Sequence, residues 1–500
     1  MGRAQWNAHA GLVLDVQEEE RDGECQGRRA GIDPRPCDGA HPNCKGFRHG
    51  HAASLGIALL TMTLLMRSRL FWRRSAAAAG IYASVVLGFF GTVIAAHAFS
   101  TRVLGLYAIV IAATGFFQTL LDLTIEEALV KYGFRFQERA DWGRLRRLFG
   151  RALQVKLAGG LLAGACLLAI APAAHALFGD DRLLKPMLIA AALPLVQAPE
   201  NVGGVALILR GRYDIRAFFL FLSMALRLGA IAVGTRYGLT QTIAAIVVAQ
   251  VLATGAVLSA GWLAFRRNPR ASALPLDEER AEIIRFVVQS SVATGVVALR
   301  TTLSPLLLGI VSSPAQVGYF RVAQAPQQGF AALSAPARLV LLTEQTRAWE
   351  RGTRETVFGG VRRYSLGAAA GVIVAVPLLL WLAPDVVRIF FTSKNAGATD
   401  ALRLIVVAGA LQFVFGWTKS FPVSIGRPNL RIWTHGVETL VLVPLVIAFG
   451  AAWGATGAAG AVLAATVVFV LYWSVLFLRI KREPDLNLTP PTQAAEVVAP

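Results

Sequence analysis

Charged residues are scarce in this chain: they make up 16% of its 500 residues, against about 25% in soluble domains. Hydrophobic residues make up 55%, and the mean hydropathy is +0.55. This composition excludes an ordinary soluble protein and indicates a membrane protein. The apolar runs are too long for β-barrel strands, which alternate with period two over about 10 residues. The sequence therefore predicts an all-α polytopic membrane protein.

Acidic residues are also few: 30 Asp and Glu stand against 49 Lys and Arg, for a formal net charge of +19. In a soluble protein this excess would suggest nucleic acid. Here the basic residues cluster in short loops between apolar runs, as in membrane proteins that contact anionic lipid headgroups. We therefore expect anionic membrane lipids as partners, and no nucleic acid.

Several kinds of site are missing from the sequence. The four cysteines show neither a disulfide framework nor regular zinc spacing: Cys25, Cys37, Cys44 and Cys166. There is no Walker A loop, so we expect no ATP hydrolysis by this chain. The loops of one set are short and hold no His/Asp pair for glycosyl transfer. The sequence thus predicts no catalytic residues, cofactor or metal.

The first 65 residues differ from the rest. Residues 1–50 are polar, and the apolar stretch 52–66 is short for a span of about 20 residues. We expect 1–65 to be a disordered tail or an artefact of the assigned gene start, with the true start at Met62 or Met66; a metal knuckle or a signal-anchor is the alternative. The basic run after Met66 precedes the first long apolar segment, as expected for a cytoplasmic N-terminus.

Twelve apolar segments are each long enough to cross a bilayer. They lie at about 76–99, 103–125, 152–178, 183–208, 214–235, 239–265, 285–310, 315–341, 362–383, 398–424, 428–450 and 454–478. We divide the chain into the tail 1–65, an N-terminal six-helix bundle 66–280, a C-terminal six-helix bundle 281–482 and a cytoplasmic tail 483–500.

The loops between these segments alternate in charge. The basic loops lie at 67–74, 131–151, 210–216, 266–280, 347–363, 427–431 and 479–482. The other loops hold few basic residues: Arg102, Arg182, Lys185, Arg236, Arg388 and Lys394. The positive-inside rule therefore places both termini in the cytoplasm.

The chain also repeats itself after about 212 to 216 residues. V-L-G-L-Y (103–107) resembles Q-V-G-Y-F (316–320), and R-G-R-Y-D-I-R (210–216) resembles I-G-R-P-N-L-R (425–431). An even number of spans gives both copies the same orientation, so we expect a pseudo-two-fold axis along the membrane normal. In transporters built this way, the substrate path lies between the copies near the midplane.

Arg227 and Arg300 lie near the middle of apolar segments. A central arginine costs roughly 2.5–3.5 kcal/mol on insertion scales, unless it faces a polar cavity or a partner. The two residues therefore indicate a cationic interior and an anionic substrate. The alternative is that each forms a structural ion pair with Asp122, Glu200 or Glu438, or that Arg227 lies at a helix–helix contact.

These patterns resemble the multidrug/oligosaccharidyl-lipid/polysaccharide exporter superfamily, and within it the polysaccharide transporters, or Wzx-type flippases. The resemblance covers about 76–480 and rests on loose apolar motifs, among them G-I-Y-A-S-V-V-L-G-F-F (80–90), V-G-Y-F-R-V-A-Q-A (317–325), A-P-D-V-V-R-I-F-F (383–391) and W-G-A-T-G-A-A-G-A (453–461). The family usually has Gly after the I-F-F position, where this chain reads F-T-S-K.

The resemblance implies a flippase for an undecaprenyl-pyrophosphate-linked oligosaccharide in the bacterial inner membrane, serving O-antigen, lipopolysaccharide or exopolysaccharide synthesis by alternating access. Partners would be the lipid-linked oligosaccharide and other polysaccharide assembly proteins. Arg227 and Arg300, one from each half, would clamp the diphosphate by bidentate hydrogen bonds. The alternatives are an ion-coupled multidrug or small-molecule exporter of the same superfamily and, less favoured, a membrane-embedded polymerase or ligase.

Other polar residues in the apolar segments are further candidates. Lys419 and Arg338 either receive the diphosphate at the inner mouth or extend to the headgroups, and Arg321 is placed to meet substrate on the outer side. Glu438 and His435 lie one helical turn apart and share a face, as an ion-coupling pair or a structural one. Polar lining is expected from Gln118, Gln197, Gln250, Gln289, Gln324, Gln327, Gln328 and Gln412, with a helix break at Pro326.

Overall fold

The structure is a computed structural model that describes residues 69–121, 123–427 and 429–483. The regular elements in these ranges are all helical. The α-helices are α4 (Arg69–Ala98), α5 (Thr101–Leu121), α6 (Ile125–Glu138), α7 (Trp142–Ile170), α8 (Ala174–Phe178), α9 (Leu184–Ala190), α10 (Ala192–Gln197), α11 (Glu200–Leu209), α12 (Tyr213–Gly234), α13 (Leu239–Arg266), α14 (Asp277–Val311), α15 (Pro314–Glu350), α16 (Arg354–Trp381), α17 (Ala383–Phe391), α18 (Thr399–Val414), α19 (Phe421–Ser424) and α20 (Asn429–Arg482). Short 3₁₀ turns are η1 (Ala171–Ala173), η2 (Asp181–Leu183), η3 (Ser393–Ala398) and η4 (Gly416–Lys419).

Many of these helices can cross a membrane. Within the described ranges nine have the required length and hydropathy, or ten if the bent pair Glu279–Val296 and Thr301–Val311 in α14 is one span. Their outer faces carry exposed apolar side chains, such as Val374 at 74% and Leu440 at 75%. Such exposure over long helices fits contact with lipid rather than water. The prediction of an all-helical multi-span membrane protein is confirmed.

Two predicted spans are interrupted. The segment 183–208 is divided into α9, α10 and α11, and the segment 398–424 into α18, η4 and α19. In the first, Pro194 and Pro199 remove backbone N–H donors, and α11 begins directly after Pro199. Both segments still contain candidate membrane spans, Asp181–Leu209 and Ser393–Val414. The break expected at Pro326 was wrong, because α15 continues through it.

Backbone torsion angles repeat along the chain. Eight described residues have positive φ, and they form four pairs: Ala140 with Gly352, Gly179 with Thr392, Gly211 with Gly426, and Gly238 with Gly454. The separations are 352 − 140 = 212, 392 − 179 = 213, 426 − 211 = 215 and 454 − 238 = 216. They match the offset of the sequence repeat, although Ala140 and Thr392 lack the conformational freedom of glycine.

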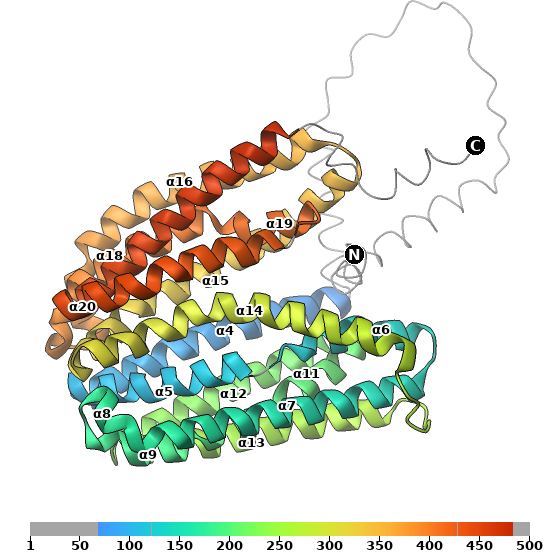
Figure 1. Cartoon of the computed structure of the whole chain (residues 1–500), viewed down its shortest axis with the longest axis horizontal. Helices are drawn as coiled ribbons and strands as arrows, with labels where there is room; N and C mark the ends of the chain where they lie inside the picture. The colour runs from blue at the N-terminus through green and yellow to red at the C-terminus, as the bar shows by residue number, and fades with distance from the viewer. Residues whose placement is uncertain (1–68, 122, 428, 484–500) are drawn as a thin grey trace, which may run out of the picture.

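The two parts of the chain meet at one end, which we call the joined end; it contains the start of α5, the start of α15 and η3. Figure 1 shows the N-terminal helices and α15 to α20 as two layers that approach each other there. A single hydrophobic core combines residues of both parts, such as Leu104 and Phe320. At the opposite end, the split end, the core divides in two, one around Leu129 and Leu148 and one around Trp417.

Glycines bring two helices of the joined end into backbone contact. A Cβ at Gly105 of α5 would overlap the Pro314 carbonyl oxygen and lie 3.0 Å from the Gly318 nitrogen. A Cβ at Gly318 of α15 would overlap the Thr101 carbonyl oxygen and lie 3.2 Å from the Gly105 nitrogen. The crossing of α5 and α15 therefore requires glycine at both positions, as at close helix contacts in membranes.

Polar contacts reinforce the joined end. Lys394 Nζ donates to the His97 carbonyl oxygen at 2.7 Å, and Thr101 Oγ1 donates to Asn395 Oδ1 at 3.0 Å. The Ala455 backbone N–H donates to Gln316 Oε1 at 2.9 Å, directly after the turn of α20 at Gly454. Segments far apart in sequence are thus tied together at this end.

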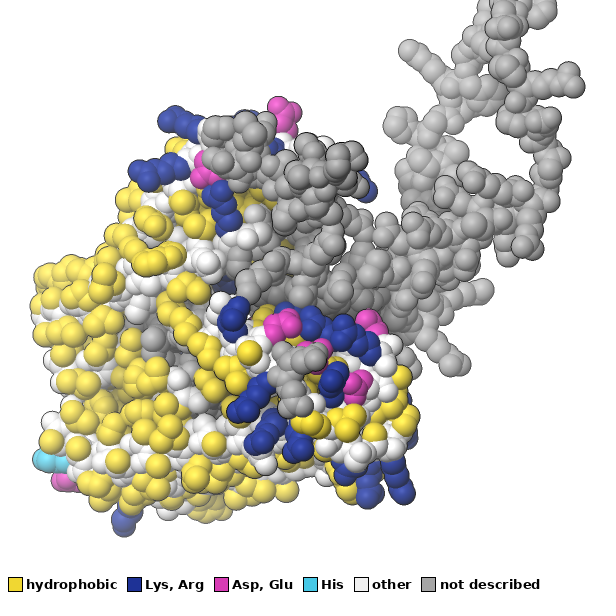
Figure 2. Space-filling view, turned by 45° about the vertical axis from the view of Figure 1, so that its right-hand side comes forward, with side chains coloured by type: hydrophobic (Ala, Val, Ile, Leu, Met, Phe, Trp, Pro, Cys, Tyr) yellow, Lys and Arg dark blue, Asp and Glu magenta, His cyan; other side chains and the backbone are white. Residues whose placement is uncertain are grey.

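The split end carries the basic loops. Figure 2 turns this side of the molecule toward the viewer and shows Lys and Arg gathered on it, with hydrophobic side chains over the rest of the visible surface. Here α6 of the N-terminal part contacts the first turns of α14: Tyr132 Oη donates to Glu282 Oε1 at 3.0 Å, and Arg135 pairs with Glu282 at 3.3 Å. Charge and apolar surface therefore separate as in a membrane protein.

Candidate functional site

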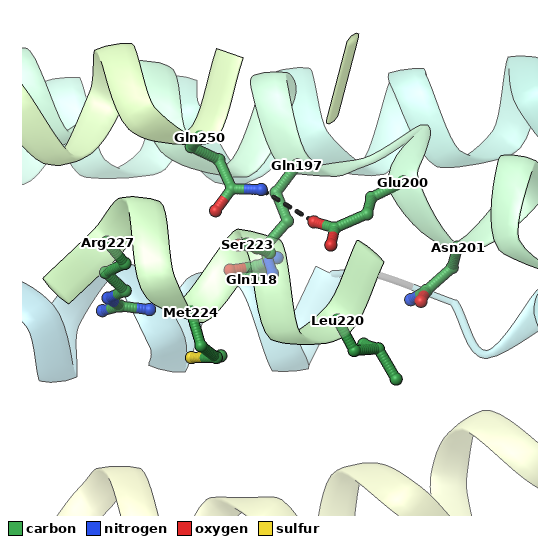
Figure 3. Close-up of a pocket in the computed structure, with 9 residues that line it drawn as sticks. All are labelled: Gln118, Gln197, Glu200, Asn201, Leu220, Ser223, Met224, Arg227 and Gln250. Carbon is green, nitrogen blue, oxygen red and sulfur yellow. Dashed lines mark hydrogen bonds between the residues drawn. The ribbon is translucent and has the colours of Figure 1, made fainter. Parts of the chain in front are cut away.

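A polar cavity of about 150 Å³ lies within the N-terminal part. Its lining side chains come from α5, α10, α11, α12 and α13, and Figure 3 shows them. They are Gln118, Gln197, Glu200, Asn201, Leu220, Ser223, Met224, Arg227 and Gln250. Three of the predicted glutamines and the predicted Arg227 thus line one cavity. By this measure a single water needs roughly 10–15 Å³, so the cavity has room for a small polar group.

The helix break after α10 shapes one wall of this cavity. Gln197 is the last residue of α10, and Glu200 is the first residue of α11 after Pro199. Irregular backbone at membrane depth is tolerated where it lines a polar cavity. The first turn of a helix also favours a carboxylate, because its free N–H groups carry partial positive charge. The two prolines therefore create the position that Glu200 occupies.

Glu200 is held by a glutamine of α13. Gln250 Nε2 donates to Glu200 Oε2 at 2.7 Å and also contacts Thr254 Oγ1 at 3.0 Å. Gln250 is 8% exposed and Thr254 is 4% exposed, so the amide is buried, and its Nε2 atom contacts both Thr254 and the half-buried Glu200. In the described part the hydrogen bond of Glu200 is to Gln250; its predicted pairing with Arg300, whose side chain lies outside that part, stays a prediction.

Arg227 is half-buried on α12 and lines the cavity. It forms no hydrogen bond or ion pair with any residue that the structure describes, although it lies within electrostatic range of Glu200. Its guanidinium group therefore keeps donors for a ligand. The substrate role of Arg227, its pairing with Asp122, which lies outside the described part, and its role in a helix–helix contact all stay predictions.

Arg321 of α15 approaches Arg227 from the other part of the chain. The two guanidinium groups lie within electrostatic range of each other, and the other charged or polar neighbour of Arg321 in that range is Tyr107. Among described residues, no carboxylate pairs with Arg321. Arg321 lies three residues after Gly318, about one helical turn from the glycine crossing. The structure thus brings together Arg227 and Arg321, a combination that sequence reasoning missed.

A second group of charges, which the sequence reasoning also missed, extends from the cavity toward the split end. Lys156 Nζ lies 2.7 Å from Glu126 Oε2, and Asn201 Nδ2 donates to Glu126 Oε1 at 3.4 Å. Arg216 lies within electrostatic range of both Glu126 and Glu200. The signal in the sequence was Lys156, a cation inside an apolar segment, which indicates a buried partner.

Glu438 and His435 form a buried pair, as their spacing predicted. His435 Nδ1 lies 3.0 Å from Glu438 Oε2, and the two residues are 5% and 1% exposed. The imidazole ring also stacks on Phe469, with 5.0 Å between the ring centroids. The shared face is therefore confirmed, while a role in ion coupling stays a prediction.

The remaining candidates are placed only in part. Lys419 is the last residue of η4 and is half-buried. Arg300 and Arg338 belong to α14 and α15, but their side chains lie outside the described part, and Asp122 lies outside it entirely. The predicted Arg227–Arg300 clamp and the predicted pairing with Asp122 therefore stay predictions.

Electrostatics outside the candidate spans centre on α6. Burial lowers the pKa of the Lys131 ammonium, an effect that Glu282 partly offsets and Arg135 adds to. Burial raises the pKa of the Tyr132 hydroxyl, and its hydrogen bond to Glu282 raises it further. Among the described side chains, no three His, Cys, Asp or Glu residues gather as metal ligands would.

Comparison with known proteins assigns the fold. The sequence profile of a family described as polysaccharide biosynthesis protein matches residues 94–343. No curated protein sequence matches the chain significantly.

Three solved structures are similar in fold. An inward-facing multidrug resistance MATE family transporter of the MOP superfamily has a TM-score of 0.65 at 14% identity, over 80% of this chain and 96% of that one. The lipid II flippase MurJ has a TM-score of 0.56 at 14% identity, over 82% and 88%. A Pyrococcus furiosus MOP superfamily transporter, described as having a binding pocket of reversed polarity, has a TM-score of 0.53 at 15% identity, over 84% and 98%.

Proposed function

Because the chain belongs to the polysaccharide biosynthesis protein family and has the fold of MOP superfamily transporters, we propose that it is a flippase for a lipid-linked oligosaccharide. The substrate is held by its undecaprenyl pyrophosphate group and crosses the bacterial inner membrane for surface polysaccharide synthesis. The observation that carries this proposal is the position of Arg227 in the lining of a polar cavity, without a hydrogen bond or ion pair to any described residue; Arg321, from the other part of the chain, lies within its electrostatic range.

Two guanidinium groups in a protein interior repel each other, because charges there are screened less than in water. A ligand with two negative charges offsets this repulsion and fills the free donors. Diphosphate matches the donor geometry, since each guanidinium can give two parallel hydrogen bonds to phosphate oxygens. An organic cation would add to the repulsion, which disfavours the alternative of a cationic-drug exporter. We assign the diphosphate to Arg227 and Arg321, with Arg300, Lys419 and Arg338 as further candidates.

The three parts of the substrate, its diphosphate, sugars and lipid tail, are proposed to lie in different places. We place the phosphate oxygens in the cavity of about 150 Å³ beside Arg227 and the sugars outside it. The lipid tail stays in the bilayer. Binding therefore depends on the part that every such substrate shares, the diphosphate.

We propose twelve spans in two six-helix bundles, 66–280 and 281–482, related by an axis along the membrane normal. The four pairs of positive-φ residues support the repeat. The 54-residue α20 has non-helical torsion angles at Gly454 and, at 1.5 Å per residue, is long enough for two crossings. The 37-residue α15 is long enough for one, and the bent pair in α14 supplies another.

The difference between the split end and the joined end suggests how alternating access would work. The positive-inside rule places the split end, with its basic loops, in the cytoplasm together with both termini. The glycine crossing then closes the outer side about one turn from Arg321, and the split end receives the substrate. A change of state must separate α5 from α15 at Gly105 and Gly318 so that the substrate can leave outward.

Ion coupling is the second candidate, either within flipping or in a small-molecule exporter. The buried His435–Glu438 pair favours it, because imidazole titrates near neutral pH and both side chains are buried. A polymerase or ligase has no such observation in its favour.

The test is export in a deletion strain complemented by variants. Arg227→Ala and Arg321→Ala should each lower surface polysaccharide at least tenfold and cause the lipid-linked intermediate to accumulate, with normal amounts of protein in the membrane. Lysine at either position should restore export only in part, because an ammonium lacks the planar fork. The matched control is Arg388→Ala, an exposed arginine of α17. Normal export by both alanine variants would overturn the proposal.

A further inference from the structure

The described contacts leave one feature of the cavity unexplained: Glu200 and Arg227 line the same small space but do not form an ion pair. A carboxylate and a guanidinium that share a buried cavity are expected to pair, because their attraction is strong where water is scarce. In Figure 3 they lie on opposite sides of the group, with Ser223 and Gln118 between them in this view. Something in the structure therefore holds them apart.

Gln250 supplies that restraint. Its Nε2 donates to Glu200 at 2.7 Å and lies 3.0 Å from Thr254, and Gln250 is 8% exposed. A buried amide fixed by two partners holds the carboxylate on the α13 side of the cavity. The hydrogen bond from Gln250 to the Glu200 carboxylate has a charged acceptor, and such bonds are stronger than hydrogen bonds between two neutral groups. The Glu200 carboxylate is thus engaged by Gln250, and it takes no donor of Arg227.

We propose that Gln250 is a positioning residue that holds Glu200 away from Arg227 and so keeps Arg227 open for the diphosphate of the substrate. Glu200 is the internal competitor for the same donors: when it is released from Gln250, it pairs with Arg227 and lowers the affinity for the anion. This inference rests on the proposed function, whose diphosphate is the ligand of Arg227.

The arrangement predicts opposite effects for two neighbouring residues. Removing the restraint frees the competitor, so Gln250→Leu should weaken binding of a diphosphate. Removing the Glu200 charge leaves the positive charge of Arg227 without a nearby carboxylate. Glu200→Gln should therefore bind the diphosphate at least as tightly as the wild type. The double variant Gln250→Leu/Glu200→Gln has no carboxylate to compete for Arg227, so diphosphate binding should return toward the wild-type level. A merely structural role for Gln250 would predict no such recovery.

Arg216 provides the competing outcome. It also lies within electrostatic range of Glu200 and shares that acid with Arg227. If the released carboxylate turned to Arg216, the donors of Arg227 would stay free, and Gln250→Leu would bind the anion as the wild type does.

The experiment measures binding of farnesyl diphosphate to the purified full-length chain in detergent by calorimetry, with farnesol as the uncharged reference. Gln250→Leu should raise the Kd about tenfold, equivalent to about 1.4 kcal/mol. Gln250→Leu/Glu200→Gln should return to within about threefold of the wild type. The matched control is Gln241→Leu, which removes an amide from an exposed position of the same helix, α13, outside the cavity lining; it should also stay within about threefold of the wild type.

The outcomes separate this inference from the proposed function. If the wild type binds farnesyl diphosphate no better than farnesol, the diphosphate chemistry is wrong, and the inference falls with it. If the wild type binds but Gln250→Leu leaves the Kd unchanged, or the double variant stays as weak as the single one, the inference alone is wrong. Should Gln250→Leu fail to fold, Glu200→Gln decides: weaker binding than the wild type would contradict the role of Glu200 as competitor.

Discussion

The joined end and the split end differ in what holds them. At the joined end the two parts of the chain share one core, and α5 and α15 cross so closely that only glycine fits at Gly105 and Gly318. At the split end the core divides into two clusters, and α6 contacts the start of α14 through apolar side chains such as Ile283 and through the exposed ion pair of Arg135 with Glu282. Close apolar packing is sensitive to every added atom, whereas exposed ion pairs contribute little. The comparison therefore predicts unequal sensitivity to mutation.

A similar contrast separates α12 from the first part of α20. Leu220 and Ser223 line the cavity, and the residues 215 positions later are His435 and Glu438 (435 − 220 = 215; 438 − 223 = 215). There the acid and the imidazole satisfy each other in a buried pair. In the described part of the chain, α12 thus lines a polar cavity at the positions where α20 holds a buried His–Glu pair, so we expect anion binding in the N-terminal part.

The largest expected effect concerns topology: the loops of the split end should all lie in the cytoplasm and those of the joined end in the periplasm. Reporter fusions at residues 140, 270 and 350 should report the cytoplasm, and fusions at 180, 237 and 452 the periplasm, because the basic loops lie at the split end. Paired cytoplasmic and periplasmic reporters provide the measurement. A periplasmic signal at 140 or 350 would contradict both the orientation and the proposed twelve spans.

The glycine crossing should be next in sensitivity. Gly318→Leu, and equally Gly105→Leu, forces α5 and α15 apart, because the new side chain overlaps the backbone of the other helix. Export should fall at least tenfold. A cysteine introduced at Lys394 should also react faster with an impermeant maleimide, in a background without the native cysteines.

The control for the crossing is Gly371→Leu. This glycine of α16 is exposed, and a Cβ there meets no atom within 4 Å. It should leave export and labelling unchanged. Wild-type export by Gly318→Leu would show that the two helices need not touch in any state used for transport.

A buried ion pair near the split end should show an intermediate effect. Lys156 is fully buried against Glu126, whose side chain is 26% exposed. Breaking a buried pair costs about 3–5 kcal/mol, and the partial exposure of Glu126 reduces this to about 2 kcal/mol for Lys156→Met. Thermal unfolding in detergent measures the loss, and Lys156→Met/Glu126→Gln should recover part of it. An unchanged melting temperature in Lys156→Met would show that the pair does not stabilise the fold.

The smallest effect is expected for the exposed contact between α6 and α14. Glu282 is 49% exposed and pairs with Arg135 at 3.3 Å. Glu282→Gln keeps an acceptor for Tyr132, so the unfolding free energy should change by less than about 1 kcal/mol. High salt should reduce even that difference. A loss comparable to that of Lys156→Met would mean that this exposed contact stabilises the fold as much as the buried ion pair does.

Much of the architecture could be predicted from the sequence. Long apolar runs predict membrane-spanning helices because the bilayer thickness sets their length, and the spacing of His435 and Glu438 predicts a shared helix face because three residues make nearly one turn. The repeat offset was visible in short motifs and recurs in the torsion angles. Arg227, Glu200 and three of the cavity glutamines stood out because polar residues are rare in apolar segments.

Contacts between distant segments were decided by the tertiary structure. Gln250 and Glu200 are 50 residues apart, and no periodicity relates α13 to the first turn of α11. The approach of Arg227 to Arg321, the pairing of Lys156 with Glu126 and the crossing at Gly105 and Gly318 likewise depend on which helix faces meet. Local sequence sets the length and polarity of each helix, because these follow from its own residues and the bilayer. The choice of neighbour depends on packing summed over the whole bundle, which no single segment contains.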